Sequence, residues 1–379
     1  MSDLRIRIDD SLEAMSASAR ELWLREEPAL QFDQTLGWSE LLSRHARERD
    51  ERIHVVSASR ATGECVGILP LKAGAPEGLW GLRTVRSLAN YYCSLYAPII
   101  DSHSDRSAIL RALLGAVTQL EPDALDLNPL AEGPGAAAAI AAVLDDLGWR
   151  IKPYFRFGNW YLEVGGRSYA EYFAALPSQL RNTVTRKEKK LRQQPGVSIA
   201  IAQAPAEVDT ALAGYQRIYE ASWKNPEPHP HFVPALVRHL AERGWLRMGL
   251  VTVGADPVAA QIWVCKDNVV SIFKLAYDER FAKLSAGSVL TTHLMRHVVD
   301  VDRVAEVDYL TGDDAYKRDW MSHRRERVGV RALRASGWRA QAEFISNSIA
   351  DGLKPVLHAL NSMRKKLATR RYPPTTPNT

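Results

Sequence analysis

The sequence has few cysteines and no long apolar run. Its three cysteines, Cys65, Cys93 and Cys265, are too few and too widely spaced for a disulfide scaffold, and no Cys or His pattern supplies metal ligands. The longest apolar run, residues 135–144, is about half of the roughly 20 residues that span a bilayer. The first ten residues, MSDLRIRIDD, lack the apolar core of a signal peptide. We therefore expect a cytoplasmic protein without a metal site.

Basic residues are not spread evenly, although the net charge of the chain is +5. Residues 181–192 (RNTVTRKEKKLR) hold six bases and one acid, and residues 361–371 (NSMRKKLATRR) hold five bases and no acid. Each segment carries +5, which leaves −5 for all other residues. Each basic segment is a candidate contact for an anionic partner, since the rest of the chain is mildly acidic.

The first half of the chain alternates helical and strand patterns. Two β-rich runs around a Thr-Gly turn indicate a hairpin, and a helix–strand–helix series follows it. We expect helices at residues 11–27, 38–49, 104–120 and 135–147, and strands at residues 53–59, 65–72 and 124–128. This alternation indicates an α/β architecture.

The pattern starts again after Pro153. Three closely spaced strands indicate a meander, and a helix and a strand follow them before a last strand that we expect to close the sheet. We expect helices at residues 168–176, 179–192, 206–223, 234–243 and 288–299, and strands at residues 159–164, 197–202, 245–253, 257–266, 269–278, 306–310 and 326–333. Both halves thus contain a hairpin, then a helix, then a strand.

The meander, the loop after it, and the next helix and strand resemble the core of the GNAT acyltransferase fold. The segments YLEVGGRSYAEYFAALPSQLRNTVTRKEKKLRQQPGV, YQRIYEASWK, PVAAQIW, FKLAYDERFAKLSAGSVL and VDYLTGDDAYKRDW look like the CelD/BcsL-type acetyltransferases. That group is related to the FemAB peptidoglycan aminoacyltransferases. The resemblance covers about residues 155–335.

This resemblance implies a mixed α/β (α+β) fold with two tandem GNAT-like domains. The expected domains are a degenerate N-terminal one (residues 1–152) and an acyltransferase one (residues 153–340). Residues 341–379 would add a basic amphipathic helix, with Val356, Leu360, Met363 and Leu367 on one face, and a disordered tail. The implied reaction moves an acyl group, in the first place acetyl, from acyl-CoA to an amine. The acceptor would be small or saccharide-linked, in exopolysaccharide or cell-envelope biosynthesis.

The loop RFAKLSAGSVL is the expected donor site. GNAT proteins bind the coenzyme A pyrophosphate on free backbone N–H groups at a helix start, where small residues admit the anion. The resemblance assigns this cradle to Ser285, Ala286, Gly287 and Ser288, with Arg280 or Lys283 as a cation. Only one of the usual two glycines is present, and the alternative interpretation is an ordinary serine-capped helix.

Four residues are candidates for the chemistry. Asp308 is a candidate base for the incoming ammonium, or else a structural carboxylate that caps the turn at residues 311–312. Lys274 lies in an apolar strand, where a charge needs an anionic partner, and we expect Asp308 to be that partner. Tyr277 is a candidate proton donor to the leaving thiolate, or a packing residue. Lys317 is a candidate for holding a phosphate or the tetrahedral oxyanion.

The acceptor is expected to meet residues from several segments. The candidates are Arg181 and Arg186 in the first basic segment, Trp223 and Lys224 before a proline-rich loop, Gln261 in the meander, and Tyr316 and Trp320 on one face of a short helix. Ordinary alternatives stay open: a solvated helix face for the basic segment, a solvated strand position for Gln261 and core packing for Trp320.

Two other functions remain open at this point. A FemAB-like aminoacyltransferase would use aminoacyl-tRNA as donor, with phosphates on the basic segments. A catalytically silent GNAT-like binding protein is also compatible with the one-glycine loop. The basic end of residues 341–379 is a candidate contact for an anionic membrane surface, which would place the protein peripherally at the inner membrane.

Overall fold

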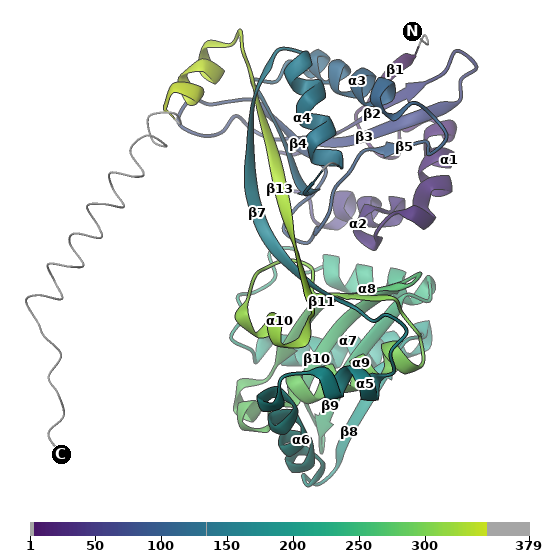
Figure 1. The fold of residues 1–379 in the computed structure, drawn as a ribbon, viewed down its shortest axis with the longest axis vertical. Helices are drawn as coiled ribbons and strands as arrows, with labels where there is room; N and C mark the ends of the chain where they lie inside the picture. The colour runs from purple at the N-terminus through teal and green to yellow at the C-terminus, as the bar shows by residue number, and fades with distance from the viewer. Residues whose placement is uncertain (1–3, 134, 347–379) are drawn as a thin grey trace, which may run out of the picture.

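The computed structural model describes residues 4–133 and 135–346. The apolar stripe and the basic segment expected near the C-terminus lie outside the described residues. Two lobes are joined by two long strands, β7 (Trp149–Glu163) and β13 (His323–Arg334), which run from one lobe into the other (Figure 1).

The first lobe is built mainly from the N-terminal half of the chain. Its strands are β1 (Arg5–Asp9), β2 (Arg52–Ser59), β3 (Cys65–Ala73), β4 (Thr84–Ser87), β5 (Ile99–Ile100) and β6 (Ala124–Ala131). Its helices are α1 (Ala17–Glu26), α2 (Leu36–His45), α3 (Arg106–Ala116) and α4 (Ala136–Asp146), with 3-10 turns η1 (Glu27–Ala29), η2 (Phe32–Gln34) and η3 (Val117–Leu120).

The second lobe follows β7 in the chain. Its strands are β8 (Val197–Ala202), β9 (Leu246–Val253), β10 (Asp256–Lys266), β11 (Val269–Tyr277) and β12 (Glu306–Asp308). Its helices are α5 (Tyr169–Ala175), α6 (Ser178–Arg192), α7 (Pro205–Glu220), α8 (Phe232–Glu242), α9 (Ala286–Asp300) and α10 (Ala315–Trp320), with the 3-10 turn η4 (Glu279–Leu284).

The two halves repeat one order of elements. Each half begins with a strand and two helices, which lead into a meander of three strands. A helix, a strand that pairs in parallel with the meander, another helix and a long final strand follow. This order runs from β1 to β7 and again from β8 to β13. We call these the first and second units. In both units the helix after the meander returns the chain to a parallel strand: β6 pairs parallel with β4, and β12 with β11. This confirms the mixed α/β class, with repeated units.

The units exchange their final strands. The sheet order is β1-β2-β3-β4-β6-β13-β7-β12-β11-β10-β9-β8, so β13 of the second unit pairs with β6 of the first, and β7 pairs with β12 of the second. β7 and β13 also pair antiparallel along most of their length. One continuous sheet therefore passes through both lobes.

An apolar core also crosses from one unit to the other. Trp38 of α2 lies edge-on to Phe232 of α8 and to Phe273 of β11, with ring centroids 5.3 and 5.9 Å apart. Phe32 packs edge-on to Trp38 at 5.2 Å, and Trp38 and Phe232 are fully buried. An apolar interface of this kind holds two units in a fixed relation.

The order of elements was predicted well, but two predictions were wrong. The strand expected to close the sheet, residues 326–333, lies instead in its middle as part of β13. The expected boundary at residues 152/153 falls inside β7, which begins ten residues before the expected strand. Pro153 suggested a break, but the upper part of β7 pairs only with β13, and proline is tolerated in edge strands. Helix ends differ slightly: α1 begins at Ala17 because the Ser16 hydroxyl caps it.

The cysteines are free and buried. Burial raises the pKa of the Cys93 thiol to about 12, so this residue stays protonated at neutral pH. Across residues 4–133 and 135–346, no group of three His, Cys, Asp or Glu side chains is arranged to hold a metal ion. In those same ranges no helix has the length and apolar character needed to cross a bilayer.

Candidate functional site

Two strands in the middle of the second unit separate after a short pairing. β11 and β12 pair only between residues 269–271 and 306–308. β11 continues to Tyr277, whereas the chain after Asp308 turns away through Leu310 and Gly312, which have φ of 55° and 100°. This divergence opens a cleft of about 440 Å³, which we call the β11–β12 cleft.

Lysines and aromatic rings from both units line this cleft. Its walls include Tyr91 and Tyr92 of the first unit, Trp223 and Lys224 after α7, Lys274 of β11, and Tyr316 and Lys317 of α10. A bulge in the β10–β11 pairing lies next to Lys274, and bulges often re-aim side chains beside functional sites. Five of the residues predicted from the sequence are therefore brought together here.

Lys274 is paired with Glu227, so the expected pair with Asp308 was wrong. Its Nζ lies 2.5 Å from Glu227 Oε1, while Glu227 Oε2 accepts hydrogen bonds from Tyr92 (2.7 Å) and Tyr91 (3.2 Å). Burial acts to raise the pKa of Glu227, but the bonds from Lys274 and Tyr92 leave it lowered. Asp308 stands opposite Ser271, before the strands diverge, and so lies away from Lys274.

Lys224 lies near aromatic rings without a salt-bridge partner. Its Nζ is 5.6 Å from the ring centroid of Trp223 and 6.0 Å from that of Tyr219, and it makes no hydrogen bond or ion pair with any described residue. Burial, followed by the nearby Lys274 charge, lowers the pKa of Lys224 to about 8. An appreciable share of this amine is therefore neutral near pH 7.5.

Lys317 is fixed to the turn that ends the cleft. Its Nζ donates to the carbonyl oxygens of Thr311 and Gly312 and lies 3.2 Å from Asp314 Oδ2. Burial lowers the pKa of Lys317, against the opposing effect of Asp314. These contacts hold the segment after β12 in place, and the neighbouring Tyr316 is exposed toward the cleft.

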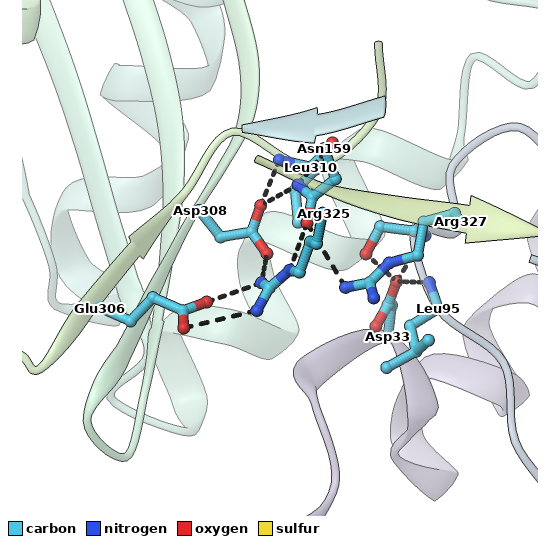
Figure 2. A network of polar contacts seen from close by, with 9 residues as sticks. Asp33, Leu95, Asn159, Glu306, Asp308, Leu310, Arg325 and Arg327 are labelled. Atoms are coloured by element: carbon cyan, nitrogen blue, oxygen red, sulfur yellow. Dashed lines mark hydrogen bonds and ion pairs between the residues drawn. The ribbon is translucent and has the colours of Figure 1, made fainter. Parts of the chain in front are cut away.

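Asp308 is buried in a polar network beside the cleft. Its Oδ1 accepts from the backbone N–H of Leu310 (2.6 Å) and from Asn159 Nδ2 (2.5 Å), and its Oδ2 from Arg325 Nη2 (2.5 Å) (Figure 2). The same Arg325 group binds Glu306 Oε1 at 2.6 Å. Asp308 is 1% exposed and does not line the cleft, which supports the structural alternative for this residue, with its cap on Leu310 instead of at residues 311–312.

The start of α9 forms the expected donor loop. Ser285 precedes the helix in a left-handed conformation (φ 52°) and makes no side-chain cap, so the serine-capped alternative is wrong. The first-turn N–H groups of Ala286, Gly287 and Ser288 have no acceptor among the described residues, as is usual at a helix start. Only Tyr277 comes within 4 Å of a side-chain position built on Gly287, so the space before this helix is open.

Tyr277, Arg280 and Lys283, which lie around the donor loop, each make contacts with neighbouring residues. Tyr277 stacks at a tilt on Trp223, with centroids 4.6 Å apart, and thus links the loop to the cleft. The guanidinium of Arg280 is bound to the buried Asp278 by Nε and Nη2, although the arginine side chain is 70% exposed. Lys187 of α6 donates to the carbonyl oxygen of Lys283 at 3.0 Å, which brings the basic helix against the loop.

Two predicted acceptor residues lie in the core. Gln261 is 2% exposed, and its Nε2 donates to the Gly287 carbonyl oxygen (2.8 Å) and to Thr291 Oγ1 (2.9 Å). Gln261 therefore holds the first turns of α9 against β10 and does not line the β11–β12 cleft. Trp320 is 5% exposed and packs in the core of the second unit, whereas Tyr316 is 46% exposed, so the expectation that the two lie on one face of the short helix was wrong.

The two predicted arginines of α6 are not in the cleft. Arg181 lines a separate open hollow between α5, α6 and α9, together with Tyr169 and Arg296. Arg186 is exposed on α6. α6 buries Val184 and Leu191 and leaves most of its basic residues in solvent. These residues form a cationic helix face that lies beside the β11–β12 cleft and not inside it.

Sequence reasoning missed the contribution of the first unit. Tyr91 and Tyr92 lie in an irregular segment, and their paired rings in NYYCSLY were the available signal. The first unit also has an opening where β4 and β6 stop pairing, a cleft of about 590 Å³ with Arg86, Asn128, Tyr154 and Arg156 in its walls. Tyr91 and Thr311 line both clefts, so the two adjoin.

The sequence between α6 and α10 matches a known domain family. Residues 178–318 match the family described as Acetyltransferase (GNAT) domain. The matched segment contains the donor loop and most of the β11–β12 cleft. The chain therefore carries a GNAT domain and is an acyltransferase. Among curated proteins, none matches this sequence.

Solved structures share the arrangement of both units. FemX has a TM-score of 0.57 at 11% identity over 86% of this chain and 96% of its own. A Bacteroides thetaiotaomicron protein of unknown function gives 0.55 at 9% over 87% and 100%. The C-terminal domain of a putative lysylphosphatidylglycerol synthetase from Agrobacterium fabrum gives 0.51 at 10% over 87% and 97%. Identities this low show a common fold alone.

Proposed function

We propose that this protein is an acetyl-CoA-dependent N-acyltransferase of the CelD/BcsL type. Its acceptor is an amine on a small or saccharide-linked molecule, and its pathway forms exopolysaccharide or other envelope material. The observation that carries the proposal is the open start of α9, where three consecutive N–H groups have no acceptor among the described residues and Tyr277 links the helix start to Trp223 of the β11–β12 cleft. Such a helix start suits the pyrophosphate of a nucleotide-linked donor.

The cleft supplies the rest of a direct transfer. A donor anchored at residues 286–288 would carry its thioester past Tyr277 toward Trp223 and the lysines. Tyr277 lies between the donor loop and Trp223, which supports a contact between Tyr277 and the donor thioester. The acceptor would enter from the adjoining first-unit cleft, whose arginines and tyrosine suit a polar or anionic molecule. Two clefts that meet allow two large substrates to reach one reacting centre.

An aminoacyl-tRNA donor is a second candidate function. The observation that favours it is the contact between Lys187 and the loop carbonyl of Lys283, which places the basic face of α6 next to the donor site. An RNA backbone on α6 would give binding that weakens steeply with salt, whereas acetyl-CoA engages few phosphates.

Acetyl-CoA is expected to raise the melting temperature by several degrees. A ligand at about 100 times its Kd adds about 2.7 kcal/mol to the free energy of unfolding. S-acetylpantetheine, which has the thioester but no pyrophosphate, should give no shift, because it cannot use the N–H groups at residues 286–288. Differential scanning fluorimetry measures both. The absence of any acetyl-CoA shift at millimolar concentration would contradict the proposed donor.

The variant Gly287→Asp is expected to remove that shift without unfolding the protein. The helix dipole stabilises a carboxylate in the first turn of α9, and the position of Gly287 has room for a side chain. The same charge repels a pyrophosphate at the helix start. If Gly287→Asp melts normally and still responds to acetyl-CoA, the anion site lies elsewhere.

A further inference from the structure

Lys224 differs from the two other lysines of the β11–β12 cleft. Lys274 is neutralised by Glu227 at 2.5 Å, and Lys317 is bound by two carbonyl oxygens and by Asp314. The Nζ of Lys224 makes neither an ion pair nor a hydrogen bond with any described residue, although the side chain is half-buried in the cleft wall. Its Nζ therefore has no fixed acceptor to retain its proton.

The groups around Lys224 disfavour its charged form. Two ammonium groups, those of Lys274 and Lys317, act on it from β11 and α10, and the nearest carboxylate is already engaged by Lys274 and two tyrosines. The other titratable or aromatic groups facing this region are Glu227 on the same loop, Tyr219 on α7, Asp314 before α10, and Tyr91 and Tyr92 of the first unit. Burial and the two neighbouring ammonium groups lower the pKa of Lys224, against the opposing effect of Glu227, and so favour its neutral amine.

We propose that the neutral amine of Lys224 is the general base of the acyl transfer. This inference rests on the proposed function. Nζ would take one proton from the acceptor ammonium, and the freed lone pair would form the new bond to the thioester carbonyl carbon. The carbon–sulfur pair would then leave on sulfur, which receives the second proton of the attacking nitrogen. The products are the amide and free thiol, and Lys224 releases its proton to solvent at the open mouth of the cleft.

Asp308 and Glu227 are poorly placed for this role. Asp308 lies outside the cleft and already accepts three hydrogen bonds. Glu227 accepts from Lys274, Tyr91 and Tyr92, and the pKa of its carboxyl is lowered. A base whose pKa is near the working pH is more effective than a strongly held carboxylate. Lys224, with a pKa of about 8, meets that condition in the cleft wall.

Kinetics against pH test the assignment. The probes are acetyl-CoA with glucosamine, lysine and spermidine, and free thiol is measured from pH 6 to 10. For lysine and spermidine, whose amines stay protonated at pH 8, kcat/KM of the wild type should rise about tenfold per pH unit up to an inflection near pH 8. It should fall again at a higher pH that changes with the amine, because the base needs an ammonium group to deprotonate. Lys224→Met and Lys224→Arg should both lose about a hundredfold or more and lack this inflection. Lys152→Met, on the upper part of β7, is the control.

Chemical labelling provides a second readout that needs no turnover. Limited acetic anhydride treatment followed by peptide mass spectrometry should modify Lys224 with a half-maximum near pH 8. Circular dichroism checks that the variants fold. A wild type that binds acetyl-CoA but acylates none of the amines, or a Lys224→Met variant within threefold of wild type, would overturn the base assignment. Labelling of Lys224 with a half-maximum well above pH 8 would also overturn the base assignment. A wild type without an acetyl-CoA thermal shift would instead overturn the proposed function itself.

Discussion

Separate production of residues 1–152 and 153–340 is expected to yield no folded N-terminal fragment. The first unit completes its sheet with β13, which belongs to the other fragment, and residues 1–152 also lack most of β7. Without β13, the apolar strand β6 becomes an open edge, and the core loses Val330 and Ala332, which are 1% and 0% exposed. We expect fragment 1–152 to show no cooperative thermal transition by circular dichroism.

A cut at the turn of Gly165 and Gly166 is the matched control. Both glycines have positive φ and lie after β7, so this cut leaves every strand whole. Co-expressed fragments cut here should reassemble, whereas co-expressed fragments cut at 152/153 divide β7 itself. A fragment 1–152 that unfolds cooperatively and stays monomeric would show that the exchanged strand is not needed.

Local patterns predicted most elements, because they depend on neighbouring residues. The meander, the donor helix and the basic helix follow from apolar periodicity and from breakers such as Pro177, and β8 has the predicted bounds. The strand exchange leaves no such signal. A strand in the middle of a sheet and one at its edge differ by partners distant in sequence, so residues 326–333 read equally well as either.

The site was predicted in part for the same reason. The sequence identified Lys224, Lys274 and Lys317 as candidate site residues, because each is a lysine within a segment that carries the family resemblance. It did not predict which side chains pair across segments. Lys274 pairs with Glu227, whose loop position has no periodic relation to β11. Tyr91 and Tyr92 enter the cleft only because the first unit packs on the second.

Replacement of Arg325 by methionine is expected to lower the free energy of unfolding by about 3 kcal/mol. Arg325 binds both Asp308 and Glu306, and Asp308 is 1% exposed (Figure 2). Removal of one partner of a buried pair leaves the other charge without compensation, which typically costs about 3–5 kcal/mol. Part of that cost is relieved here, since Asn159 and the Leu310 N–H still bind Asp308. Urea unfolding at pH 7 measures the change.

Arg324→Met is a matched control on the same strand. The side chains of Arg324 and Arg325 are 30% and 27% exposed, but the carboxylates that Arg324 binds, Asp313 and Glu326, are 43% and 36% exposed. Because solvent screens such pairs, Arg324→Met should cost about 0–1 kcal/mol. An equal loss in both variants would show that the burial of Asp308 is not the cause.

The double variant Arg325→Met, Asp308→Asn separates stability from chemistry at this position. The amide of Asn at position 308 needs no counter-charge, so the double variant should recover much of the stability that Arg325→Met loses. The effects of the two changes on the free energy of unfolding should be non-additive, because Arg325 and Asp308 are in contact. If Asp308 only anchors the turn after β12, the recovered protein should also recover acetyl transfer. A double variant that regains its stability but stays inactive would return Asp308 to the reaction as its base, in place of Lys224.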